Sequence, residues 1–191
     1  MLPLPPVHTT PSTLSTPPPL SIPVVPFYSQ FKDIHTASWQ KVGCGITSLA
    51  MIIDYYSTST VSVDTLLKKG INSGAYNTKN GWIHKGLISL SNEYGLSGNS
   101  YDLNTLGKEA AFTKLKTALA DGPVIVSVHY KFDPRSSIPH LVVIDGIDEN
   151  GNVYYNDPAA KLGQKTISSV DFQKAWKKKY IVLRPTEEKT A

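Results

Sequence analysis

The spacing of apolar residues predicts helices over most of the first two thirds of the chain. Apolar positions recur with helical periodicity over residues 45–56, which predicts a helix that begins close to Cys44 and buries one face. Similar patterns predict helices over residues 64–69, 81–94 and 108–120. Ser62 can cap the second of these helices, and the Asp-Gly-Pro sequence at 121–123 is a stop signal for the last.

After residue 122 the pattern changes to that of strands. β-Branched runs predict strands over residues 123–130, 141–147 and 153–156. The sequence Asp-Glu-Asn-Gly at 148–151 predicts a tight hairpin turn between the last two. A helix over residues 170–178, capped by Ser168 or Ser169, and a strand over residues 180–183 follow. Because helices come first and mostly antiparallel strands later, the expected fold class is α+β.

Proline content separates an N-terminal arm from the folded part. Residues 1–26 hold nine of the fourteen prolines, mixed with Thr and Ser, a composition typical of an extended linker. We therefore expect an arm over residues 1–23, one folded domain over residues 24–185 and a tail over residues 186–191. The N-terminus lacks the pattern of a signal peptide, which favours a cytoplasmic protein as written. The arm would also suit tethering, as in a processed fragment of a secreted or cell-surface protein.

Charge and hydropathy exclude several classes of function. The net charge is +4, and the late lysines at 174 and 177–179 are interpreted as a solvated helix face, so we expect no nucleic-acid partner. No stretch approaches the ~20 apolar residues of a membrane span. The chain has one cysteine, which excludes an internal disulfide and a cysteine-rich zinc site. We expect neither a metal nor a cofactor.

That cysteine, Cys44, lies between two glycines at the start of the first strong helix. Free N–H groups and the helix dipole favour an anion at this position, and the thiolate is the form of cysteine that attacks a carbonyl. The glycines leave room for a substrate backbone to approach the sulfur. A buried cysteine packed at a helix end would have the same local sequence. The pattern around Cys44 therefore leaves both a nucleophilic and a structural role open.

A cysteine nucleophile needs an imidazole base and a third group that orients the imidazole. The five histidines are His8 in the arm, His35 in a polar loop, His84 on the surface of a helix, and His129 and His140 on strands. A hairpin centred between residues 149 and 150 makes Asp157 oppose Val142, so that Asp157 and His140 become diagonal neighbours on one face. One uncompensated bulge would reverse this parity. We find no such carboxylate for His129, and we therefore choose His140 as the base and Asp157 as its partner.

An ordered set of motifs resembles the bacteriocin-processing (double-glycine leader) peptidase-like family. The motifs are residues 25–30, Trp39, residues 44–51, 122–126, 140–148 and 155–158. Their order and spacing agree with the family from residue 25 to about residue 183. No single motif is specific, but the ordered set is. Because the chain has no Walker-type phosphate loop and no membrane span, it resembles the free-standing branch of that family.

The resemblance implies a papain-like fold in which a helical N-terminal half carries the catalytic Cys at a helix start and packs on an antiparallel sheet. It implies a cysteine peptidase with a Cys44–His140–Asp157 triad, a peptide or protein substrate and no cofactor. It also implies a Gln before the Cys that helps to form the oxyanion hole. We favour Gln30, with Gln40 as the alternative. Two other functions stay open, acyl transfer on the same fold and a non-catalytic binding module.

Overall fold

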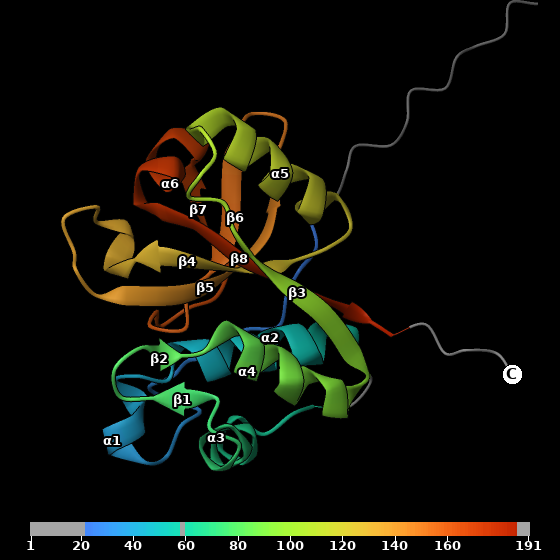
Figure 1. Ribbon diagram of the computed structural model, residues 1–191, viewed down its shortest axis with the longest axis vertical. Coiled ribbons are helices and arrows are strands. Elements are labelled where there is room, and N and C mark those ends of the chain that lie inside the picture. Colours follow the sequence, from blue (N-terminus) through green and yellow to red (C-terminus); the bar gives the residue numbers. More distant parts are fainter. Residues whose placement is uncertain (1–21, 58–59, 187–191) are drawn as a thin grey trace, which may run out of the picture.

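The computed structural model describes residues 22–57 and 60–186. A six-stranded antiparallel sheet lies between two groups of helices (Figure 1). The strands are β3 (Leu96–Asp102), β4 (Val124–His129), β5 (Pro139–Ile147), β6 (Asn152–Asn156), β7 (Lys165–Ser168) and β8 (Trp176–Pro185), in the spatial order β3-β8-β4-β5-β6-β7. The predicted α+β class is confirmed. Nearly all of the predicted arm and tail lies outside the described residues.

One face of the sheet is covered by the N-terminal helices. These elements are α1 (Ala37–Gln40), α2 (Cys44–Tyr56), α3 (Val63–Asn72), α4 (His84–Ser91) and the short helix η1 (Asn92–Tyr94), with a two-stranded ribbon of β1 (Tyr76–Asn77) and β2 (Gly81–Trp82) beside them. The Ser62 side chain accepts a hydrogen bond from the Thr65 amide, so the predicted cap of α3 is present. The helix expected over residues 81–94 is shorter, because Gly81 and Trp82 pair with β1 instead.

The opposite face carries α5 (Lys108–Ala120) and α6 (Ser169–Ala175) (Figure 1). Ser168 caps α6 by accepting a hydrogen bond from the Asp171 amide. The predicted extension of α6 to residue 178 is wrong, because the chain enters β8 at Trp176. A further short helix, η2 (Tyr130–Phe132), directly follows β4.

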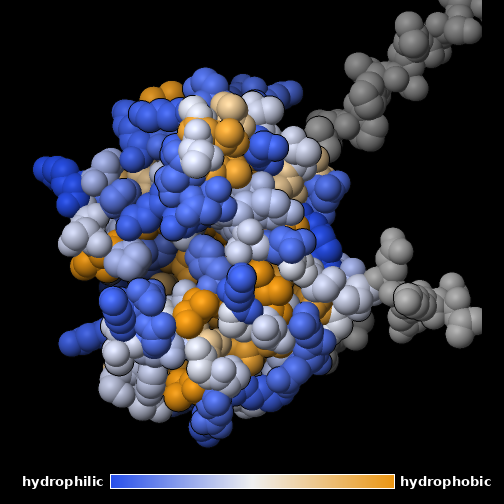
Figure 2. Space-filling view, in the orientation of Figure 1, coloured by the Kyte–Doolittle hydropathy of each residue, from blue (hydrophilic) through white to orange (hydrophobic). Residues whose placement is uncertain are grey.

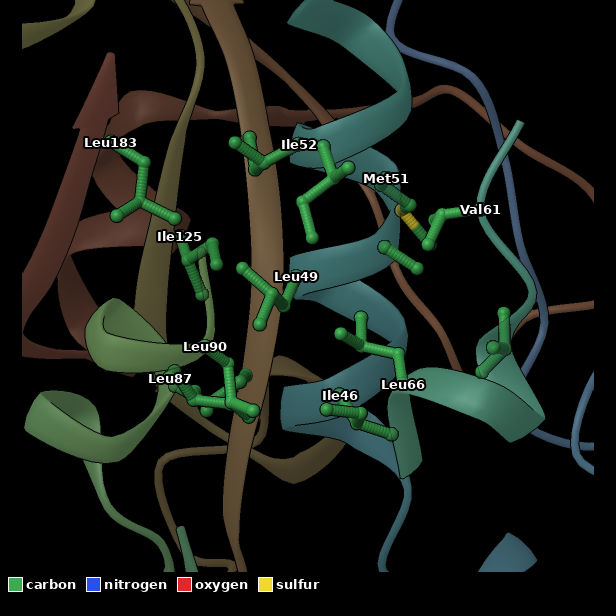
Figure 3. Packing of buried hydrophobic residues seen from close by; sticks show 14 of the residues in the cluster. Ile46, Leu49, Met51, Ile52, Val61, Leu66, Leu87, Leu90, Ile125 and Leu183 are labelled. Atoms are coloured by element: carbon green, nitrogen blue, oxygen red, sulfur yellow. The ribbon is translucent and has the colours of Figure 1, made fainter. Parts of the chain in front are cut away.

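The central strands are buried on both faces, and this explains their continuous apolar sequences. In β4 and β5, Ile125, Leu141 and Val143 pack against α2, α3 and α4, while alternate residues such as Val126 and Val142 pack against α5 and α6. Figure 3 shows Leu49 of α2 between the sheet and the leucines of α4. One hydrophobic core therefore holds α2 against β5, and the other holds α5 and α6 against the opposite face of the sheet.

Figure 2 shows that hydrophilic side chains cover most of one face of the molecule. The apolar side chains visible there form small patches, most of them over the half that contains α3 and α4 in Figure 1. Within the residues that the structure describes, no helix is both long enough and apolar enough to cross a membrane.

Candidate active site

A cleft of ≈ 710 Å³ opens at the N-terminal end of α2. Its walls come from both halves of the molecule: the start of α2 and the β1–β2 ribbon on one side, and β4, β5 and β8 on the other. Cys44 and His140 both line it. The two most promising residues in the sequence therefore meet in one concave surface, although they come from distant parts of the chain.

Cys44 is the first residue of α2, and its side chain is partly exposed to the cleft. Gly43 precedes it as the N-cap and provides no side-chain cap, so the first amides of α2 are not capped by a side chain. A Cβ on Gly43 would lie 2.3 Å from Ile34 Cδ1, and one on Gly45 would lie 2.5 Å from Trp82 Cγ. The flanking glycines are thus required for close packing as well as for an open approach to the sulfur.

His140 is almost fully buried, with 4% of its surface exposed. Its Nε2 lies 2.6 Å from Asp157 Oδ1, and its side chain also forms a hydrogen bond with Cys44. Burial alone would lower the pKa of His140, but the hydrogen bonds with Asp157 and Cys44 outweigh it and raise the pKa to about 9. The Tyr130 ring packs perpendicular to the imidazole, with 5.2 Å between centroids.

Asp157 follows the last residue of β6 and is held in place from two sides. Its Oδ1 accepts a hydrogen bond from the Ala159 amide at 2.8 Å as well as contacting His140. Burial opposes ionisation of Asp157, but the hydrogen bond and charge of His140 and the Ala159 amide lower the pKa of the carboxyl below its ordinary value. The arrangement keeps a carboxylate beside an imidazolium.

The register of the β5–β6 hairpin brings these two residues together. Val143 pairs with Asn156, which is the predicted register, and its continuation would set Asp157 opposite Val142. Nearer the turn the register differs by one residue, because Ile147 pairs with Val153 and a bulge intervenes at Asp145. The predicted turn centre is therefore wrong by half a residue. The bulge at Asp145 compensates for this shift, so the strands beyond it have the register that the sequence predicted.

The two glutamines have different surroundings. Gln30 is 3% exposed and lines the cleft, and its Nε2 donates to the carbonyl of Gln40 at 2.7 Å. Its backbone amide donates to the carbonyl of Pro158, which ties Gln30 to the Asp157 loop. Gln40 instead turns its side chain to the carbonyls of Phe31 and Ile34. Gln40 therefore supports the loop, whereas Gln30 lines the cleft, and within the described residues its buried Oε1 has no hydrogen-bond partner.

The other three described histidines have other hydrogen-bond partners. His35 pairs with Asp64 on the surface, and His129 Nδ1 lies 2.6 Å from the carbonyl of Ser136. His84, which the helical pattern assigns to the surface, lines the cleft, and its Nε2 lies 3.2 Å from Ser127 Oγ. Burial, followed by the charge of Lys179, lowers the pKa of His84.

Sequence patterns did not single out several of the residues that line the cleft. Trp82 donates from Nε1 to the carbonyl of Val42 at 2.6 Å and covers the start of α2. Lys177 and Lys179 belong to β8 and line the cleft, so their interpretation as a solvated helix face is wrong. No local signal in the sequence marks these positions, since their direction depends on a bulge in a strand. Over the described ranges, no group of three His, Cys, Asp or Glu residues is close enough to hold a metal ion.

Comparison with known proteins gives a family and a fold. The model of the Peptidase_C39-like family matches residues 22–184. A double-glycine-motif protease from the AMS/PCAT transporter, solved in complex with the leader peptide, is 24% identical, with a TM-score of 0.59 over 85% of this chain and 93% of that one. The peptidase domain of Streptococcus ComA, a bifunctional ABC transporter of a quorum-sensing pathway, is 22% identical, with a TM-score of 0.58 over 76% and 93%. No curated protein matches the sequence. The mixed helical and antiparallel architecture is papain-like, as in these neighbours.

Proposed function

We propose that this chain, which belongs to the Peptidase_C39-like family and is a cysteine-type peptidase, hydrolyses peptide bonds through a thioester formed on Cys44. One observation carries the proposal. The buried His140 contacts Asp157 through Nε2 and forms a hydrogen bond with Cys44, which leaves Nδ1 as the nitrogen that faces the thiol. This is the chain of contacts that activates a cysteine nucleophile.

In the proposed mechanism, the Cys44 thiolate attacks the peptide carbonyl and His140 gives its proton to the departing amine. The C–N bond breaks and a thioester remains. His140, now neutral, removes a proton from water, whose oxygen attacks the thioester and releases the acid. Asp157 holds the ring and stabilises the imidazolium. The Cys44 amide and the side-chain amide of Gln30 stabilise the oxyanion in both steps.

A peptide substrate is favoured by two observations. One structural neighbour was solved with a leader peptide bound. The cleft of this chain is lined by residues from α2, the β1–β2 ribbon and three strands. Ion pairs of thiolate and imidazolium react with carbonyl carbons, which an extended peptide presents. The proposal does not extend to a leader peptide as substrate, because the bound leader peptide belongs to the neighbour.

The test is the pH dependence of Cys44 alkylation by iodoacetamide. In the wild type, the thiol should react readily at pH 6, because the proposed mechanism needs a thiolate beside the His140 imidazolium. His140→Ala should shift the reaction to the pH range of a free thiol and slow it at pH 6 by about 100-fold. His129→Ala, which removes a histidine outside the cleft, is the matched control and should keep the wild-type profile.

Product analysis completes the test. The wild type should cleave members of a peptide pool, detected by mass spectrometry, and Cys44→Ala should cleave none while keeping the same unfolding transition. Wild-type turnover in Cys44→Ala would contradict the mechanism, and so would an alkylation profile that His140→Ala leaves unchanged.

A further inference from the structure

Strand β8 has an irregularity directly beside the cleft. Ser127 of β4 pairs with Lys179, but its neighbour Val128 pairs with Trp176, so two residues of β8 have no partner in the ladder. One of them, Lys178, has a φ of 53°, in the left-handed region that costs a non-glycine residue on the order of 1 kcal/mol. Bulges next to active sites commonly redirect side chains. The strain at Lys178 suggests that this bulge has such a role.

The neighbouring lysines of β8 point in different directions. Lys178 Nζ donates to the carbonyls of Asn104 and Leu106, at 3.0 and 2.8 Å, before the start of α5. Lys177 and Lys179 instead line the cleft that contains Cys44. Lys177 and Lys179 flank Lys178, so they share one face of β8, as residues i and i+2 do in an extended strand, and that face lines the cleft.

Apart from Cys44 and His140, the charged residues that line the cleft are all lysines. Four lysines line it, namely Lys41, Lys79, Lys177 and Lys179, and its lining contains no Asp or Glu. Among the described residues, Lys177 has no ion-pair partner, and Lys179 pairs with Asp102 at 3.0 Å. Both side chains of that pair are about half exposed, so the pair is weak and can exchange partners.

Neutral polar groups lie beside these lysines. His84 and Ser127 face each other at 3.2 Å in the same cleft, and Ser127 is the ladder partner of Lys179. A carboxylate accepts several hydrogen bonds, and these bonds are strongest when the donors are charged. An ammonium pair next to a hydroxyl and an imidazole supplies such donors.

We propose that Lys177 and Lys179, with His84 and Ser127, form a subsite that binds a carboxylate of the peptide substrate. The inference rests on the proposed function, because it assigns a preference to the same cleft. The carboxylate belongs either to an acidic side chain or to the C-terminus of the peptide, and the experiment separates these two sources.

The experiment measures how well peptides protect Cys44 from iodoacetamide. Four acetylated, alanine-rich heptapeptides combine Glu or Gln at an internal position with a free or amidated C-terminus. A peptide that carries the recognised carboxylate should protect at a concentration about 10-fold lower than its neutral counterpart. Preference for internal Glu identifies a side chain, and preference for the free terminus identifies the terminal carboxylate. In 0.5 M NaCl the preference should shrink severalfold.

Variants locate the effect. Lys177→Met and Lys179→Met should each reduce the preference by about 3- to 10-fold. Lys85→Met removes the same charge from the exposed surface of α4, outside the cleft lining, and should leave the preference unchanged. Equal protection by charged and neutral peptides, or a preference that survives both cleft substitutions, overturns the subsite. Protection needs only a thiol that can be alkylated, so this result is independent of the pH profile that tests the proposed nucleophile.

Discussion

The Ser48 hydroxyl donates a hydrogen bond to the carbonyl of Leu141, at 3.2 Å, in the buried contact between α2 and β5. Ser48 lies one helical turn after Cys44, and Leu141 is the residue that follows His140. This single bond therefore connects the two elements that bear the thiol and the imidazole, close to both. Since His140 and Cys44 belong to different parts of the chain, their alignment depends on how α2 is docked on the sheet.

Ser48→Ala should weaken that docking. We expect a loss of about 1 kcal/mol in the free energy of unfolding, from urea denaturation, and a severalfold slower alkylation of Cys44 at pH 6. Thr47→Val is the matched control, because within the described part of the chain the buried Thr47 hydroxyl has no hydrogen-bond partner. That substitution should leave stability unchanged or increase it by up to about 1 kcal/mol. Equal effects of the two substitutions would show that the bond to Leu141 does not matter.

The pKa of His140 predicts how stability depends on pH. The folded-state value of about 9 lies above the ordinary 6.5, so the stabilisation is complete below pH 6.5 and is lost as the pH rises through 9. The loss should reach about 3 kcal/mol at most. The lowered pKa of Asp157 gives the opposite pH dependence of stability. Its stabilising contribution is lost as the pH falls below the ordinary value of 3.8.

Urea unfolding between pH 7 and pH 9 measures this dependence. The slope against pH should be smaller in His140→Ala than in the wild type, and His129→Ala should keep the wild-type slope. Asp145, whose pKa burial raises to about 7, still titrates at the lower end of that range, but it is present in all three proteins, so its contribution cancels in the comparison. A His140→Ala variant with an unchanged slope would contradict the assignment.

Substitutions of Gln30 and Gln40 should have different effects on the kinetics of peptide cleavage. Gln30→Ala removes the proposed oxyanion donor, so kcat should fall by about 100- to 1000-fold on a fluorogenic peptide that the wild type cleaves, with a smaller change in KM. Gln40→Ala removes hydrogen bonds to the carbonyls of Phe31 and Ile34. It should mainly lower the free energy of unfolding, by about 1 kcal/mol. A larger loss of kcat in Gln40→Ala than in Gln30→Ala would reverse the assignment.

Gly45 determines how closely Trp82 packs on the start of α2. A Cβ there would lie 2.5 to 2.8 Å from Trp82 Cγ, Cβ and Cδ1, which cannot move far because Trp82 is 7% exposed. Gly45→Ala should therefore cost about 2 kcal/mol of stability, measured by urea unfolding, and disturb the cleft wall. In Gly107→Ala the added Cβ meets nothing within 4 Å, so that control should cost less than about 1 kcal/mol.

Sequence patterns could predict the elements whose signals are local. The helix that begins at Cys44 has a clear apolar period, and Ser62 and Ser168 are the caps that their positions predict. The strands β3 and β7 were missed, because they are mostly exposed edge strands. Strand β3 reads Leu-Ser-Gly-Asn-Ser-Tyr-Asp, and a strand that buries little surface shows little alternation of apolar residues.

By itself, the sequence determined the start of α2, the α+β class, and a hairpin in which Asp157 returns beside His140. Each depends on interactions between residues close together in the chain. Only the tertiary structure decided that His140 meets Cys44, that Gln30 rather than Gln40 lines the cleft, and that Lys177 and Lys179 reach it. These relationships depend on how one hydrophobic core docks α2 against the sheet and on the point at which α6 ends and β8 begins, and neither is marked by a local pattern.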